Sequence, residues 1–147
     1  MKAALLFTIL FVMASATPAH AEQFRQFGDY TVHYSAFTTD ILTPSVAKSY
    51  GIRRSKNRAL LNITVLKKVI DAPGRPVKAR VDASATNLSA QLRELHVREL
   101  TETDAVYYLA ETVVNDGETL KYDLEVTPEG EATTYRFSFY QQFGSTH

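Results

Sequence analysis

The sequence contains no cysteine, no tryptophan and only two methionines in 147 residues. Without cysteine the chain can form no disulfide bond, no thiolate metal site and no thiol nucleophile. Small secreted domains often depend on disulfides because their cores are small. A cysteine-free chain has to rely on a buried core instead, and its length suffices for one domain with such a core.

Histidines and catalytic motifs are also scarce. Beyond residue 21 the histidines are His33, His96 and His147, and no two of them have the spacing of a metal-ligand pair. The chain has no glycine-rich phosphate loop, no G-x-S-x-G and no H-E-x-x-H. The sequence therefore nominates no catalytic residue, metal ligand or cofactor, and it favours a protein that is not an enzyme. The alternative is a hydrolase whose site, with His33, acidic turns and hydroxyl groups, forms only on folding.

A long apolar run occurs near the N-terminus. Residues 4–13 (ALLFTILFVM) follow Lys2, and Ala19 and Ala21 then flank His20 in an A-x-A pattern. These are the three parts of a secretory signal peptide, and the run is about half of the ~20 residues that a membrane-spanning helix needs. We expect residues 1–21 to be a signal peptide cleaved after Ala21. Residues 22–147 should then be a single periplasmic domain without stable membrane insertion. A retained N-terminal anchor is the alternative.

Most of the remaining chain alternates between apolar and polar residues, which is the pattern of half-buried strands. Such stretches, or stretches apolar on both sides, are 29–37, 58–66, 77–85, 105–114, 119–126 and 133–143. Turn residues separate them at 71–76, 101–104, 115–118 and 128–131. Residues 88–100 fit a helix or a strand, and we expect a strand over about 91–101 that pairs with 105–114. The predicted core contains Val32, Tyr34, Ile63, Val65, Val81, Leu109, Leu124, Phe137 and Phe139.

One short helix is indicated by its end residues. Thr43 suits the N-cap, Pro44 the first helical position and Gly51 the position just past the end. About seven strands with frequent turns and one helix near 44–50 predict an all-β protein. We expect an antiparallel two-sheet sandwich of the immunoglobulin-like kind, with an open barrel as the alternative.

Charge is distributed unevenly along the chain. Residues 22–80 contain eleven Lys or Arg and four Asp or Glu, whereas residues 81–147 contain four and twelve. Either the two halves interleave and pair their charges, or the basic half meets an anionic partner. Nucleic acid is a poor candidate for that partner, because residues 22–147 carry a slightly negative net charge and the expected compartment is the periplasm.

The densest basic stretch is SYGIRRSKNR, residues 49–58. It follows the predicted helix, so it should form a surface connection, and loops commonly carry binding groups. A helix C-terminus attracts one or two cations without any ligand, but this stretch has four in six positions. Arginine also suits carboxylate or phosphate groups. We therefore predict an anion-recognition patch formed by Tyr50, Arg53, Arg54, Lys56 and Arg58.

The run DYTVHYSAFTTDILTPSVAKSYGIRRSKNRALLNITVLK (29–67) resembles a family of uncharacterised exported proteins of Gram-negative bacteria, classed only as a domain of unknown function. DAVYYLAE (104–111) fits the same family. The shared positions are Tyr30, His33, Tyr34, Leu42, Pro44, Ala47, Tyr50, Gly51, Ile52, Arg54, Ser55 and Asn62. The resemblance implies a periplasmic location and a β-rich domain. It implies no activity, substrate or cofactor.

These observations favour a small periplasmic binding or accessory module. Its partner would be an envelope protein or an anionic envelope component, held by end loops or by an exposed sheet edge. The alternatives are the hydrolase described above and an assembly factor that adds a strand to a partner's sheet. The sequence leaves the oligomeric state open.

Overall fold

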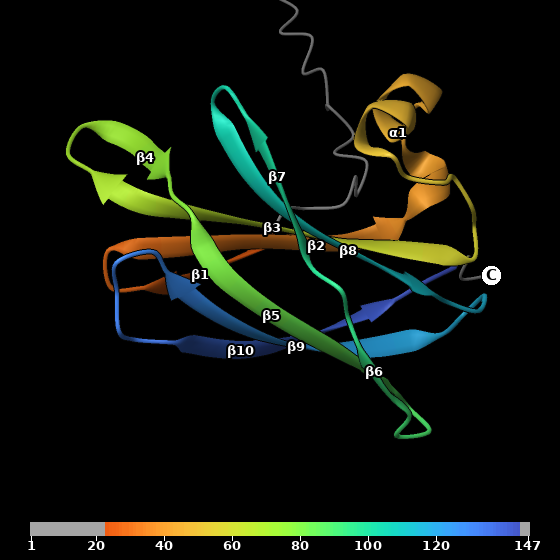
Figure 1. Cartoon of the computed structure of the whole chain (residues 1–147). Helices are drawn as coiled ribbons and strands as arrows, with labels where there is room; N and C mark the ends of the chain where they lie inside the picture. Colours follow the sequence, from red (N-terminus) through yellow and green to blue (C-terminus); the bar gives the residue numbers. More distant parts are fainter. Residues whose placement is uncertain (1–22, 145–147) are drawn as a thin grey trace, which may run out of the picture.

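The structure is a computed structural model that describes residues 23–144, so the expected signal peptide and its cleavage site lie outside the described residues (Figure 1). Among the described residues there are ten strands, a short 3-10 helix and an α-helix. In chain order these are β1 (Gln23–Phe27), β2 (Tyr30–Thr38), η1 (Thr39–Ile41), α1 (Pro44–Tyr50), β3 (Arg58–Val69), β4 (Ala72–Pro76), β5 (Ala79–Asn87), β6 (Leu92–Glu94), β7 (Arg98–Glu102), β8 (Ala105–Val113), β9 (Thr119–Pro128) and β10 (Tyr135–Gln142).

The strands form two antiparallel sheets that face each other. One sheet has the order β1-β2-β3-β8-β7, with β4 paired to the end of β3 beyond its pairing with β8. The other has the order β10-β9-β5-β6. The prediction of an all-β antiparallel two-sheet sandwich with one short helix is therefore confirmed.

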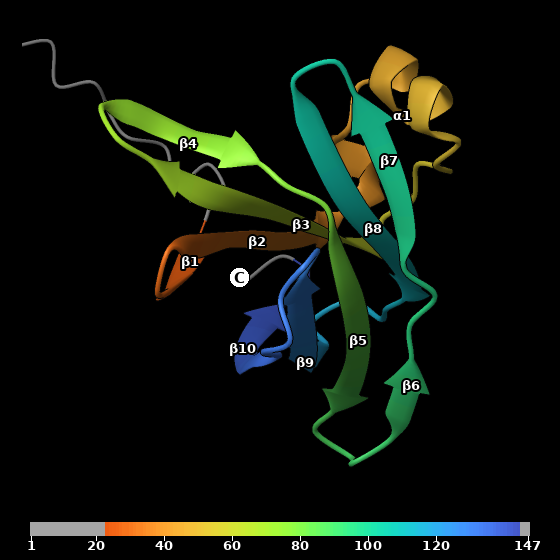
Figure 2. The same cartoon turned by 60° about the vertical axis from the view of Figure 1, so that its left-hand side comes forward.

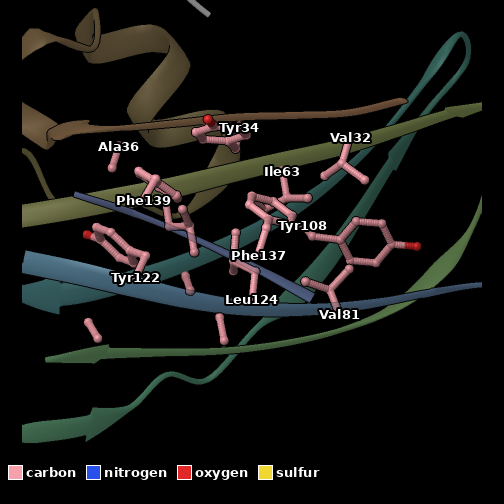
Figure 3. Packing of buried hydrophobic residues seen from close by; sticks show 14 of the residues in the cluster. Val32, Tyr34, Ala36, Ile63, Val81, Tyr108, Tyr122, Leu124, Phe137 and Phe139 are labelled. Carbon is pink, nitrogen blue, oxygen red and sulfur yellow. The ribbon is translucent and has the colours of Figure 1, made fainter. Parts of the chain in front are cut away.

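Alternating side chains of both sheets fill the space between them (Figure 3). Aromatic rings join the layers: the Tyr34 ring lies 5.1 Å from that of Phe137 and 4.4 Å from that of Phe139, measured between centroids. The Tyr122 ring stacks on Phe139 at 5.0 Å. All nine residues predicted for the core are buried.

A second, smaller apolar cluster lies on the outer face of the first sheet, beneath α1. It contains Ala47, Ile52, Leu60 and Leu109, so Leu109 is buried under the helix and not between the sheets. The predicted ends of α1 are confirmed, since Thr43 accepts a hydrogen bond from the Val46 amide and Gly51 is left-handed at φ 65°. No helix of residues 23–144 is long and apolar enough to cross a membrane.

The expected single strand over 91–101 is wrong. β6 pairs with β5 in one sheet, whereas β7 pairs with β8 in the other, as the expected hairpin requires. Between them the chain crosses from sheet to sheet, and Leu95 and Val97 pack against the main core on the way (Figure 2). The apolar residues that suggested one continuous strand over 91–101 thus include those of the segment that crosses between the sheets.

The predicted turn over 71–76 is also mostly strand. β4 pairs with β3 through Leu66–Pro76 and Lys67–Arg75, and the chain reverses at 70–71. Pro73 and Pro76 are compatible with β4 because it is an outer strand, where a missing amide donor is tolerated.

Truncation of Phe137 tests the inner face of the second sheet. Phe137 is buried and contacts the rings of Phe27 and Tyr34. Phe137→Ala should lower the free energy of unfolding by about 3–5 kcal/mol, measured by urea denaturation. Tyr140→Ala, on the same strand but 64% exposed, should change it by less than about 1 kcal/mol. Equal effects of the two variants would contradict the assignment of faces.

Two buried tyrosines predict a loss of stability at alkaline pH. Desolvation is the main cause that raises the pKa of Tyr108 to about 12, and it also raises the pKa of Tyr122. Because the unfolded value is about 10, the folded state holds these protons more tightly. The stability that these two protonated tyrosines contribute is therefore fully present below about pH 10, and it is lost as the pH rises toward 12. Melting temperatures across this window should fall, and Tyr122→Phe should make the fall shallower. A flat profile would contradict this account.

Candidate functional site

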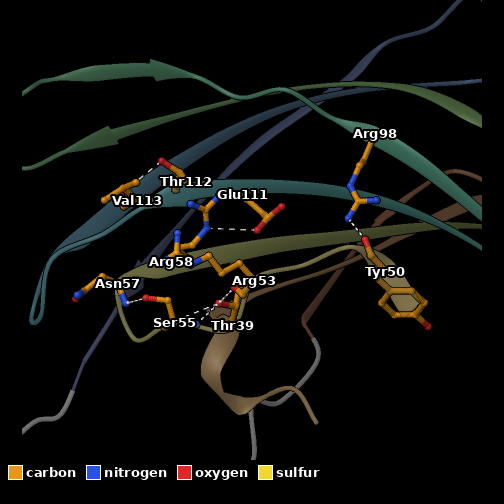
Figure 4. A network of polar contacts seen from close by, with 10 residues as sticks. All are labelled: Thr39, Tyr50, Arg53, Ser55, Asn57, Arg58, Arg98, Glu111, Thr112 and Val113. Carbon is orange, nitrogen blue, oxygen red and sulfur yellow. Dashed lines mark hydrogen bonds and ion pairs between the residues drawn. The ribbon is translucent and has the colours of Figure 1, made fainter. Parts of the chain in front are cut away.

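The connection between α1 and β3, residues 51–57, is called the basic loop here, and it is fixed by Thr39, the first residue of η1. Thr39 is fully buried. Its hydroxyl donates to the Arg53 carbonyl at 2.7 Å and accepts from the Ser55 amide at 2.8 Å (Figure 4). The Ser55 hydroxyl in turn accepts from the Asn57 amide at 3.0 Å. The backbone of the loop is therefore held in one conformation.

Arg54 is used within the loop itself. Its Nε donates to the Leu42 carbonyl at 2.7 Å and its Nη2 to the Asp40 carbonyl at 3.0 Å. These carbonyls lie in the η1–α1 segment, so the guanidinium ties the loop to that segment. Arg54 has correspondingly fewer donors left for a ligand.

Arg58 and Tyr50 also have partners within the chain. Arg58 Nε lies 3.5 Å from Glu111 Oε1, and both atoms are buried without a hydrogen bond, so the ion pair compensates their burial. The Tyr50 hydroxyl donates to Glu102 at 3.0 Å, and this bond is the main cause that raises the Tyr50 pKa. The Tyr50 carbonyl accepts from Arg98 (Figure 4). The ion pairs of Arg58 with Glu111 and of Lys78 with Glu99 join cations of the basic half to carboxylates of the acidic half, which supports the interleaving of the two halves.

Arg53 and Lys56 differ from the other three. Both residues are exposed, and within residues 23–144 neither side chain has an ion pair or a hydrogen bond. Of the five predicted site residues, these two are the ones that the structure leaves available to an external group.

Lys56 lines a groove of about 560 Å³ where the ends of the two sheets meet. We call it the end groove. Its lining comes from β2 and η1, from the basic loop, from the turn before β9 and from the end of β10, namely Ala36, Phe37, Thr38, Asp40, Lys56, Asn57, Asp116, Gln141, Gln142, Phe143 and Gly144.

The end groove carries charges of both signs. Asp40 Oδ1 is buried and has no hydrogen-bond partner among the described residues. Asp116 lies close against the backbone of Gly144. A Cβ atom added to Gly144 would lie 2.1 Å from Asp116 Oδ1. Gly144 has a φ of +103°, so both conformation and space require glycine there. With Lys56 and three amide side chains nearby, the end groove is suited to a polar ligand.

The hydrolase alternative gains no support from His33. This residue lies on the outer face of the first sheet, with its ring 5.8 Å from that of Phe24, and it does not line the end groove. Across residues 23–144, no group of three or more His, Asp or Glu side chains is placed to hold a metal ion.

Sequence reasoning missed Asp40, Asp116, Gln141 and Gln142 as neighbours of the basic loop. They come from segments far apart in the chain, and no motif links them. Of the residues that line the groove, the sequence analysis predicted only Lys56 as a site residue, because it belongs to a basic stretch. The groove itself depends on how the two sheets meet.

The protein is a small β protein, an antiparallel sandwich with a short helix over one face and a groove at one end. Its family is given by comparison of the sequence with family models. The model of DUF4426, a domain of unknown function, matches residues 24–144. The chain belongs to this family. A DUF4426 family protein from Pseudomonas aeruginosa has a similar structure, with 34% identity, a TM-score of 0.73, and coverage of 86% of this chain and 97% of that one. The resemblance noted from the sequence is thus confirmed.

More distant structures share the fold alone. FetP of uropathogenic Escherichia coli strain F11, expressed recombinantly in the periplasm, has 9% identity and a TM-score of 0.59, with 87% of this chain and 97% of FetP covered. A copper-bound FetP variant has 9% identity and a TM-score of 0.58, with 84% and 95% covered. A search of curated proteins found no match.

The two neighbouring arginines should respond differently to substitution. Arg54→Gln removes two hydrogen bonds to carbonyls and should lower the free energy of unfolding by about 1 kcal/mol, since the site is exposed. Arg53→Gln should leave stability within about 0.5 kcal/mol of the wild type, because no bond of its side chain is lost. Denaturant titration measures both, and a larger effect for Arg53→Gln would mean that the loop is held differently.

Proposed function

We propose that the protein is a small periplasmic binding module that holds an anionic group of an envelope partner through Arg53 and Lys56, the second of which lines the end groove. The observation that carries this proposal is that the four cations of residues 53–58 fall into two groups. Arg54 and Arg58 are engaged within the chain, whereas Arg53 and Lys56 are exposed and unpaired among the described residues. Cations that stabilise nothing internally are available to a ligand.

The geometry supports binding more than catalysis. The loop is held rigid by Thr39 and Arg54, so a ligand meets a pre-organised surface and less conformational entropy is lost on association. The described residues that line the end groove supply carboxylates, amides and a lysine but no histidine, so they assemble no base–nucleophile pair of the usual kind.

The proposed location rests on the N-terminal sequence. Residues 1–21 have the three parts of a signal peptide, and a protein of the same fold, FetP, was expressed recombinantly in the periplasm. The copper in the FetP variant gives no reason to propose copper binding here, since the described residues contain no candidate metal cluster.

Site-specific photo-crosslinking in the periplasm tests the proposal. A photoreactive residue replaces Gln142, an exposed residue of the end groove. When the rest of the chain is wild type, this photoreactive residue should form a crosslink to one discrete species. Arg53→Gln with Lys56→Gln should abolish the capture and leave the melting temperature unchanged, since these side chains make no bonds within the described residues.

The matched control is Arg80→Gln with Arg136→Gln. It changes the net charge equally, but on the outer face of the second sheet, where both arginines are exposed and form surface ion pairs worth little. Capture should persist in this control. Equal loss in both double variants would show a general effect of charge and would refute a site at Arg53 and Lys56.

A further inference from the structure

The edge strand β10 directs alternate backbone groups away from its sheet. The Phe143 amide donates to the Glu118 carbonyl, and the Phe143 carbonyl accepts from the Gly117 amide, so Phe143 faces β9. Because successive residues of a strand alternate, Ser138, Tyr140 and Gln142 face the open edge. In agreement, the Ser138 carbonyl accepts from Arg25 and the Gln142 carbonyl accepts from the Gln141 side chain.

Among residues 23–144, side chains of β1 cover the first half of this edge and leave the second half open. The Phe27 ring of β1 stacks on Tyr135 at 4.8 Å, and the Arg25 guanidinium lies over the Phe137 ring at 6.0 Å. Tyr140 lies beyond this contact and is 64% exposed. Its amide and carbonyl make no hydrogen bond outside the β9–β10 pairing with any described residue, and by the alternation they point away from β9.

Among the described residues, the other sheet also has an unpaired edge at the same groove. β1 begins at Gln23, opposite Tyr34, and no described strand pairs with this side of β2 from there to its end at Thr38. Along β3, the Val65 carbonyl faces β4 and the Lys68 amide faces β2. The direction of backbone groups alternates from residue to residue in paired antiparallel strands. Counted along β2 from this pairing, the amide and carbonyl of Ala36 point away from β3. Ala36 and Gln142 both line the end groove. Backbone edges of both sheets therefore border one polar groove.

We propose that the end groove binds an extended segment of a partner polypeptide, which adds to β10 as a strand at Tyr140 and places an acidic side chain against Lys56. This inference rests on the proposed binding function and names the class of ligand. Backbone donors and acceptors spaced along a strand edge are matched by another strand. Asp40 and Asp116 favour a basic residue elsewhere in the segment, so the bound segment carries both charges.

Two substitutions of Tyr140 separate the backbone from the side chain. Tyr140→Pro removes the outward amide donor and leaves the pairing with β9 intact, because proline is tolerated on an edge strand when its nitrogen faces outward. Tyr140→Thr removes the ring but keeps the amide. Strand addition predicts that the first variant loses binding and that the second retains it.

The probe is a displayed library of random peptides of about ten residues, a usual strand length, selected on the wild-type protein. Enriched peptides should carry at least one acidic residue. Their affinity should fall about tenfold or more for Tyr140→Pro and about as much for Lys56→Gln, but less than about threefold for Tyr140→Thr. No enrichment, or equal binding to Tyr140→Pro and Tyr140→Thr, would overturn the inference.

Amide hydrogen exchange gives a second measurement that needs no proline variant. On peptide binding to the wild type, the Tyr140 amide should change from fast to slow exchange, whereas the Phe139 amide, which faces β9, should be slow in both states. A Tyr140 amide that stays fast with peptide bound would refute strand addition even if Tyr140→Pro failed to fold.

Failure of this inference can be distinguished from failure of the proposed function. If photo-crosslinking at Gln142 captures a glycan or lipid that depends on Arg53 and Lys56, the binding function stands and the polypeptide ligand is wrong. If neither crosslinking nor peptide selection gives a species that depends on these cations, both are wrong.

Discussion

The strand β3 is the element on which the rest of the structure depends, because it is apolar on both faces. Leu61, Ile63 and Val65 point between the sheets, whereas Leu60 lies beneath α1 on the other side. Side chains alternate strictly along a strand, so a shift of one residue would exchange the two cores. The pairing of β3 with β2 and β8 is therefore fixed by burial on both sides. The basic loop, which connects α1 to β3, is fixed along with it.

Much of the fold follows from alternation, and its failures have identifiable causes. Strands with a clean apolar face, such as β2, β5 and β9, are recognisable in the sequence because one face has to be buried. β1 lacks this pattern, since Phe24 is exposed and Phe27 is its apolar residue packed against the core. β4 was missed because its proline and glycine residues are typical of turns. The break between β6 and β7 depends on which sheet each half joins, and local sequence does not contain that information.

The candidate site was predictable in charge but not in arrangement. Residues 49–58 showed an excess of cations, and the structure places Lys56 beside a groove. The use of Arg54 could not be foreseen, because its acceptors are carbonyls, whose directions depend on the backbone and not on residue type. Glu111 is 53 positions from Arg58 along the chain, and the two meet only because β8 pairs with β3. Intramolecular pairing of these cations thus decides which ones remain for a partner.

The open half of the β10 edge raises the question of why copies of the protein would not pair through it. Exposed edges favour association between like chains, and folded proteins commonly protect them with charged side chains or by covering them. Here side chains of β1 cover the first half of the edge, and Lys56 lines the same groove as Gln141 and Gln142 at the end of the strand. β10 itself, YRFSFYQQ, contains no acidic residue. A second copy of β10 added at this edge would bring no carboxylate of its own to Lys56. The charge beside the groove therefore disfavours self-association through β10 and favours a foreign strand that carries an acidic residue.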